Sequence, residues 1–146
     1  MLRTKASTYA VLAVAEIARR QASRAGGVQA GEIARCIGLP AAYAAKVLTQ
    51  LARANILRSD RGPRGGFRLV NSPELIPLLD VIEAVDGTIV AEVALMDWEG
   101  EGQQTLRRLD EVFGEIIERV RGALRRETIA DVLRSGSPAP ALVPTS

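Results

Sequence analysis

The chain contains no histidine and one cysteine among its 146 residues. Histidine is the commonest general base and the commonest metal ligand, so its absence removes both roles. The one cysteine, Cys36, cannot form a disulfide within the chain. A single chain of this composition cannot build a zinc site or an iron–sulfur cluster from Cys and His, nor a Ser–His or Cys–His nucleophile pair. We therefore expect a protein that is not an enzyme and that has no metal site and no cofactor.

Aromatic residues are scarce, and long apolar runs are missing. Phe, Trp and Tyr make up 3% of the chain and apolar residues 47%, so the core must consist of Ala, Leu, Val and Ile, as in helical proteins. No apolar run reaches transmembrane length, and no signal-peptide cleavage site follows the basic start of the chain. We expect a cytoplasmic protein with no membrane partner.

Acidic residues are rare in the first half of the chain. Residues 1–70 carry 12 Lys or Arg and 3 Asp or Glu, whereas residues 71–146 carry 7 and 14, so the net charge of +2 conceals halves of +9 and −7. A strongly basic half favours a polyanion partner such as nucleic acid over the alternative, a solvated basic surface.

Three helices are predicted in this basic half. The first covers residues 7–20, with Ser7 as a plausible N-cap. The second and third cover residues 30–38 and 41–57, and a tight turn that contains Gly38 joins them. Two helices joined in this way are typical of a helix-turn-helix.

Glycine, proline and arginine are concentrated in the sequence SDRGPRGGFRLV, residues 59–70. β-capable runs lie at both ends of its central turn, which predicts a β-hairpin and hence a winged helix-turn-helix, with Val28 as a further short strand. Arg61 and Arg64 are candidate DNA contacts, and Gly65 belongs to a loop whose glycines let the backbone approach phosphates or the minor groove. The alternative for the two arginines is an ordinary solvated turn.

The third helix carries two further candidates for DNA binding. Tyr43 and Lys46 lie three apart near its start, where a helix in the major groove contacts bases. Tyr43 fits core packing equally well. The glycines of RGPRGG match neither the P-loop nor the dinucleotide-binding spacing, which further disfavours an enzyme.

The acidic half is predicted to contain a helix over residues 74–85, with Pro77 in its first turn, then a loop over residues 88–102 with a helical turn near residues 93–98. Trp98 in this loop fits a ligand platform or a dimer contact. A short helix over residues 128–133 is predicted before the tail.

The longest predicted helix covers residues 103–126. Its apolar residues are spaced 3, 4, 3 and 4 apart, which is a heptad seam: Leu106, Leu109, Phe113, Ile116 and Val120. We favour a dimer interface over packing on its own domain, because the winged module already closes its own core.

Cys36 has two interpretations. It is a filler on the second helix, which we favour, or an exposed thiol sensor. Arg35 is the one neighbour in sequence that argues for a lowered thiol pKa.

Five stretches in this order resemble the IscR/NsrR-like (Rrf-two) family of bacterial winged-helix transcriptional regulators. They are STYAVLAVAEIA, AGEIARCIGLPAAYAAKVLTQLARANIL, RSDRGPRGGFRL, LLDVIEAVDG and TIADVL, and they extend from Thr4 to Leu133. The resemblance implies a homodimer that binds palindromic operator DNA through two winged domains and pairs through the long helix. In several members three cysteines before that helix hold an iron–sulfur cluster.

This sequence departs from the family in two places. The stretch TIVAEVALMDWEGEGQQTL contains neither Cys nor His, so the cluster chemistry does not carry over. Small residues replace the polar residues common on the recognition helix, namely Ala41, Ala42, Ala44 and Ala45. Fewer base-reading hydrogen bonds then remain, and specificity must depend more on the wing, on Lys46 and on DNA shape.

The expected fold is mainly α with a small β-hairpin. Residues 1–87 form a winged helix-turn-helix domain, 88–102 a loop, 103–134 the dimerisation helix and a short C-terminal helix, and 135–146 a disordered tail. We expect a homodimeric, sequence-specific DNA-binding regulator, in the first instance a repressor, that responds to an unidentified small-molecule or protein effector. The alternative is a winged-helix protein-interaction module that docks on an acidic protein.

Overall fold

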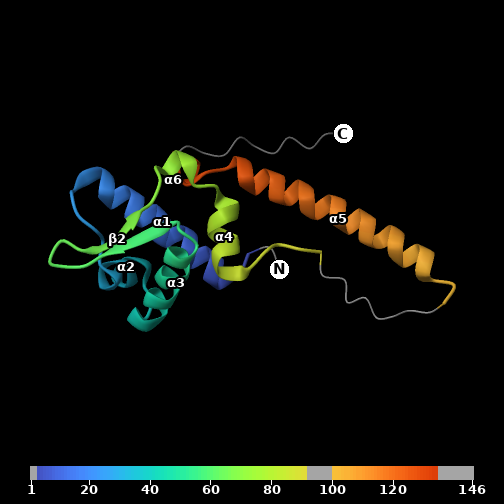
Figure 1. Ribbon diagram of the computed structural model, residues 1–146, viewed down its shortest axis with the longest axis horizontal. Coiled ribbons are helices and arrows are strands. Elements are labelled where there is room, and N and C mark those ends of the chain that lie inside the picture. Colours follow the sequence, from blue (N-terminus) through green and yellow to red (C-terminus); the bar gives the residue numbers. More distant parts are fainter. Residues whose placement is uncertain (1–2, 92–99, 135–146) are drawn as a thin grey trace.

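Helix α1 (Lys5–Ser23) runs through the centre of the amino-terminal part of a computed structural model that describes residues 3–91 and 100–134 (Figure 1). Thr4, not Ser7, is its N-cap: the Ser7 N–H donates to Thr4 Oγ1 over 3.1 Å, and the Thr4 N–H donates to Ser7 Oγ over 2.9 Å. The predicted start was therefore wrong by one turn. Both residues can cap a helix, and the reciprocal pair selects the earlier one.

Helices α2 (Ala30–Ile37) and α3 (Ala41–Arg53) form the predicted helix-turn-helix. Gly38 ends α2 with left-handed backbone (φ 75°), and Pro40 is the N-cap of α3. Helix α3 ends earlier than predicted because Asn55 adopts a left-handed conformation (φ 61°), which turns the chain into the hairpin.

Strands β1 (Leu57–Asp60) and β2 (Gly66–Leu69) pair antiparallel and confirm the predicted hairpin, with residues 61–65 as its loop. Val28, between α1 and α2, forms an antiparallel bridge to Phe67 through bonds of 2.9 and 2.8 Å. The wing is thus attached to the segment that precedes the helix-turn-helix.

The chain beyond the hairpin departs from the predicted helix over residues 74–85. A 3-10 turn, η1 (Pro73–Leu75), comes first, and α4 (Leu78–Asp86) begins only after Pro77, which is its N-cap. Proline lacks the N–H that an α-helix interior uses, so a helix cannot extend back through Pro77 with its bonds intact. The expected helical turn near residues 93–98, including Trp98, and the tail over 135–146 lie outside the described residues.

Helix α5 (Gln103–Arg126) has the predicted bounds and extends away from the other helices (Figure 1). Helix α6 (Ile129–Arg134), which the predicted domain division groups with α5, packs against α1 and η1. Ile129 is fully buried there, and its N–H donates to the Ile76 carbonyl over 2.9 Å. The chain therefore returns to the winged domain after α5.

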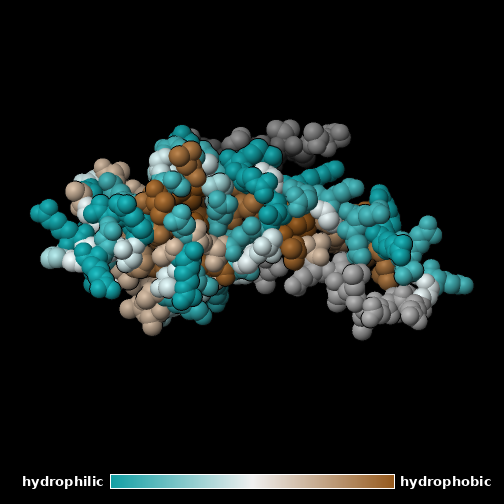
Figure 2. All heavy atoms as spheres, in the orientation of Figure 1, coloured by the Kyte–Doolittle hydropathy of each residue, from teal (hydrophilic) through white to brown (hydrophobic). Residues whose placement is uncertain are grey.

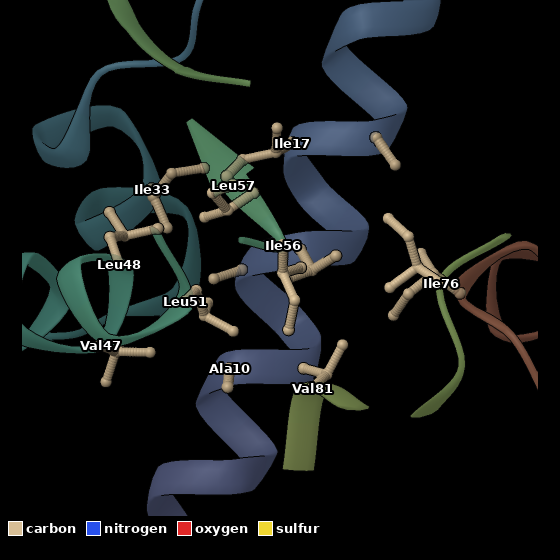
Figure 3. Packing of buried hydrophobic residues seen from close by; sticks show 14 of the residues in the cluster. Ala10, Ile17, Ile33, Val47, Leu48, Leu51, Ile56, Leu57, Ile76 and Val81 are labelled. Atoms are coloured by element: carbon tan, nitrogen blue, oxygen red, sulfur yellow. The ribbon is translucent and has the colours of Figure 1, made fainter. Parts of the chain in front are cut away.

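The core lies between α1 and the surrounding elements and is aliphatic, as the composition predicted (Figure 3). Its largest fully buried side chains include Ile17, Ile33, Leu48, Leu51 and Leu57. Among the described residues, none of the helices is both long enough and apolar enough to cross a membrane.

A chain of ion pairs connects α1 to α2. Glu16 accepts from Arg19 and Arg20 at 2.6 Å each, and Arg20 continues to Glu32 at 2.8 Å. The hydrogen bond from Arg19 is the main reason why the pKa of Glu16 falls from 4.5 to about 2; burial opposes this shift, and bonds from Arg20 and Cys36 support it. Glu16 therefore stabilises the fold while it is ionised.

Replacing Glu16 by glutamine is expected to flatten the acid side of the stability profile. The carboxylate has a lower pKa in the folded state, so its contribution is complete above about pH 4.5 and is lost as the pH falls towards 2. Urea unfolding at several pH values between 2 and 6 measures this. Glu74→Gln, at an exposed residue with no ion pair within the described chain, is the control. Identical profiles for Glu16→Gln and the wild type would contradict the assignment.

Candidate nucleic-acid interface

The outward face of α3 carries two exposed cations, Lys46 and, seven residues later at the end of the helix, Arg53. Lys46 is exposed, as are Ala41, Ala42 and Ala45. Ala44 is 2% exposed and buried in the core, so it does not share the outer face with these three alanines. The first two turns of α3 therefore present Lys46 as their charged group, among alanines.

Tyr43 lies at the edge of this face. It is half-buried, and its ring meets the ring of Tyr9 edge-on, with centroids 5.8 Å apart and planes at 83°. The structure thus gives Tyr43 a packing role between α3 and α1. A DNA contact by its phenolic edge remains a prediction.

The loop of the hairpin carries two exposed arginines, Arg61 and Arg64. Within the described residues neither forms an ion pair, unlike Arg20, Arg24 and Arg68 in the same half of the chain. Their charges are available to an external anion, because no carboxylate in the described chain lies within 4 Å of either.

Gly65, the third candidate in this loop, lies inside it. It is buried, its N–H donates to the Gly62 carbonyl over 2.9 Å, and its own carbonyl accepts from Gln29 Nε2 over 2.9 Å. A Cβ at this position would lie 2.3 Å from the Asp60 carbonyl oxygen. Gly65 therefore shapes the loop and does not face the solvent.

The wing loop and α3 lie at the same end of the molecule, opposite the projecting α5 (Figure 1). Two further cations that sequence reasoning left unassigned, Arg3 and Lys5, are exposed at the start of α1 and line a shallow hollow with Thr8 and Tyr9. The Tyr9–Tyr43 contact joins this hollow to α3. The local sequence could not predict that Arg3 and Lys5 lie near α3, because the Tyr9–Tyr43 contact joins residues that are distant in the chain.

Helix α5 presents the predicted apolar seam to solvent. Leu109, Phe113 and Ile116 are 45–47% exposed, and α5 has no buried residue within the single chain. Apolar atoms are visible among the hydrophilic ones on this projecting part (Figure 2). Leu106 and Val120, at the ends of the seam, are half-buried.

The α5 helix is attached to the winged domain by a charged contact. The Arg121 guanidinium pairs with Glu83 on α4 and also donates to the Ile89 carbonyl over 3.3 Å. Glu83 in turn accepts from the Ile89 N–H over 2.9 Å. Through these contacts Ile89, which follows α4, is held against Arg121 on α5.

Cys36 is exposed on α2, beside the Glu16 carboxylate and the Arg20 guanidinium. It is therefore a surface residue of α2. Whether it acts as a thiol sensor is a separate prediction.

These features define a winged helix-turn-helix protein with an additional projecting helix. The sequence matches the Rrf2 family, described as iron-dependent transcriptional regulators, over residues 3–135. The chain belongs to this family, and it is a DNA-binding transcriptional regulator rather than an enzyme.

Individual relatives agree with this assignment. The chain is 33% identical over 131 residues to the putative regulator BadM of Rhodopseudomonas palustris, covering 90% of this chain and 78% of BadM. It is 30% identical to a putative regulator of Mycobacterium tuberculosis, covering 89% and 80%. The structure is similar to CymR, the global cysteine regulator of B. subtilis, with a TM-score of 0.72, 25% identity and coverage of 91% and 97%. The fold is also that of T. potens IscR, with a TM-score of 0.69 at 22% identity over 94% of this chain and 89% of IscR.

The donors in this chain do not fit a cysteine-held iron–sulfur cluster. The sequence contains only Cys36 and no histidine, and Cys36 lies on α2 rather than in the segment before α5. Within residues 3–91 and 100–134, no three His, Cys, Asp or Glu side chains are grouped so as to hold a metal ion.

Proposed function

We propose that this regulator is a homodimeric, sequence-specific repressor that works without an iron–sulfur cluster. The observation that carries the proposal is the separation of two surfaces. Cations that form no ion pair with the described residues lie on α3 and the wing at one end of the molecule, and an apolar seam that no described residue covers lies on α5. The first suits a polyanion and the second suits a symmetric copy of the same helix.

On DNA, α3 enters the major groove and its Lys46 contacts base edges or phosphate. Arg61 and Arg64 reach the flanking minor groove or backbone. Alanines at the groove face offer no hydrogen bonds to bases, so much of the specificity comes from DNA shape and from the spacing of two half-sites. Two winged domains joined through α5 cover both half-sites, and occupancy alone is enough to block a promoter.

A titration of labelled DNA from upstream of the protein's own gene tests this proposal. Fluorescence anisotropy should show tight binding that weakens steeply with salt and that unlabelled random DNA competes poorly. Binding that is weak and indifferent to sequence would contradict the proposal and favour docking on an acidic protein instead.

Iron analysis of the purified chain tests the absence of a cluster. We expect a colourless protein without stoichiometric iron, and the same operator affinity before and after treatment with a chelator. A brown protein with bound iron would contradict this part of the proposal and require ligands other than three cysteines.

Replacing Arg64 by alanine is expected to weaken operator binding about tenfold or more, because each dimer loses two phosphate or minor-groove contacts. The slope of log affinity against log salt should become shallower by about two, since each lost phosphate contact contributes roughly 0.9. Anisotropy titrations at several salt concentrations measure both quantities. Arg125→Ala, which removes the same charge from an exposed position on α5, is the control and should change neither. An unchanged slope in Arg64→Ala would remove the wing from the interface.

A further inference from the structure

The segment between α1 and α2 holds the wing through several backbone contacts. Gly27 N–H donates to the Arg64 carbonyl over 3.1 Å, and Val28 bridges to Phe67. One side chain adds a further contact, because Gln29 Nε2 donates to the Gly65 carbonyl over 2.9 Å. The carbonyls of Arg64 and of the residue after it are therefore both bonded to residues just before the helix-turn-helix.

Gln29 is itself held firmly at the start of α2. It is the N-cap residue, and its carbonyl accepts from the N–H groups of Glu32 and Ile33 over 3.0 and 3.2 Å. Its own N–H donates to Glu32 Oε1 over 3.4 Å. Glu32 is in turn paired with Arg20 at 2.8 Å and with Arg24 at 3.0 Å. The side-chain amide of Gln29 thus starts from a point that is rigid relative to the helix-turn-helix.

The far end of this bond is equally constrained. Gly65 N–H closes the loop onto the Gly62 carbonyl over 2.9 Å, and Gly65 is buried, so its peptide has little room to move. Arg64 precedes Gly65 directly, and its side chain is exposed. A shift of the Gly65 carbonyl therefore moves the point from which the Arg64 side chain extends.

We infer that Gln29 is a positioning residue for DNA binding, which sets the place of the Arg64 guanidinium relative to α3. The inference rests on the proposed function, because it requires that the wing contacts DNA. The wing adds to DNA affinity only if Arg64 reaches the DNA backbone while Lys46 lies in the major groove. A preformed arrangement of the two side chains lowers the entropic cost of binding. Glutamine suits this role, because its amide donates to a carbonyl whereas glutamate would place an acceptor against an acceptor.

The chain offers a matched control for Gln29. Gln21, on α1, also binds the backbone of the hairpin: its Oε1 accepts from the Leu69 N–H over 2.9 Å. Both bonds join a glutamine amide to the backbone of the wing region, but Leu69 is at the far end of β2 from the loop. Removing either bond should cost similar stability, and only the bond from Gln29 should affect the position of Arg64.

The test compares operator binding by the full-length Gln29→Ala, Gln21→Ala and Arg64→Ala variants and by the Gln29→Ala/Arg64→Ala double variant. We expect Gln29→Ala to weaken binding about fivefold to tenfold and to make the salt slope shallower, whereas Gln21→Ala stays within twofold of the wild type. Adding Gln29→Ala to Arg64→Ala should weaken binding by less than a further twofold, because the group that Gln29 positions is already gone. Gln29→Glu should bind at least as weakly as Gln29→Ala.

Three outcomes would overturn the inference. The first is wild-type affinity and salt slope in Gln29→Ala while Arg64→Ala binds weakly; the proposed function then survives and the positioning role does not. The second is full additivity in the double variant, which would make Gln29 an independent contact. The third is equal weakening by Gln21→Ala and Gln29→Ala, which would reduce both to general stabilisers. Wild-type binding by Arg64→Ala itself would instead contradict the wing assignment on which the inference rests.

Discussion

Replacing Phe113 by aspartate is expected to separate the proposed dimer into monomers and to weaken operator binding by at least about 100-fold. Phe113 lies at the middle of the apolar seam of α5 and is 47% exposed in the single chain. In a twofold dimer both copies would bury the new carboxylate, and an unpaired buried charge costs several kcal/mol. A monomer then binds one half-site without the gain from the second.

Analytical ultracentrifugation measures the first part of this prediction, since the dimer has twice the 15.6 kDa mass of one chain. Anisotropy with a full operator and with a single half-site measures the second. The monomer should bind the two DNAs with nearly equal affinity. Because Phe113 is not among the buried residues of its own chain, the far-UV circular dichroism should stay close to that of the wild type.

Arg107→Ala is the matched control for Phe113→Asp. It also lowers the charge of the chain by one, and Arg107 is exposed on a different side of α5 from the seam, by the period of 3.6 residues per turn. It should remain dimeric. A Phe113→Asp protein that keeps the dimer mass would show that α5 is not the interface.

The elements with strong local signals could be predicted from the sequence. The bounds of α5 were correct because its apolar repeat is continuous and a glycine, Gly102, precedes it. The helix-turn-helix was correct because Gly38 and Pro40 break the chain between two amphipathic stretches. The hairpin was correct because turn residues separate two β-capable runs.

Two of the errors arose where two nearby residues offered the same signal. Thr4 and Ser7 are both good N-caps, and only their reciprocal bonds select Thr4. Pro73 and Pro77 both fit the first turn of a helix, and the chain uses one in a 3-10 turn and the other as an N-cap. Propensity could not rank such pairs, since the packing around each one decides.

The charged residues of the candidate interface could be predicted from the sequence, but the residues that hold them in place could not. Arg61, Arg64 and Lys46 could be selected from the basic, glycine-rich pattern alone. The bond from Gln29 to Gly65 joins residues 36 positions apart, and the pair of Arg121 with Glu83 joins residues 38 apart. Nothing in the local sequence of either partner marks such a bond, so the residues that place the wing required the structure.

Replacing Gly66 by alanine is expected to combine backbone strain with a steric clash and to destabilise the fold by about 3–5 kcal/mol. Gly66 has a φ of 117°, which L side chains rarely adopt. A Cβ would also lie 2.6 Å from the Val28 carbonyl oxygen and 2.7 Å from its carbon. The Val28–Phe67 bridge must then open, and with it the attachment of the wing to the helix-turn-helix. Urea unfolding at one fixed protein concentration measures the loss, because the stability of a dimer depends on concentration.

Two further glycines separate the causes of this loss. Gly62 has a similar φ of 102° but nothing within 4 Å of its Cβ position, so Gly62→Ala reports backbone strain alone, roughly 1–3 kcal/mol. Gly27 has no positive φ, and its Cβ would lie 2.8 Å from the Gly65 carbonyl oxygen, so Gly27→Ala reports the steric contact alone, also about 1–3 kcal/mol. Gly66→Ala should lose about as much as both together. If Gly66→Ala costs no more than Gly62→Ala, the close approach of the wing to Val28 contributes nothing to stability, and the wing is held by its own hairpin bonds.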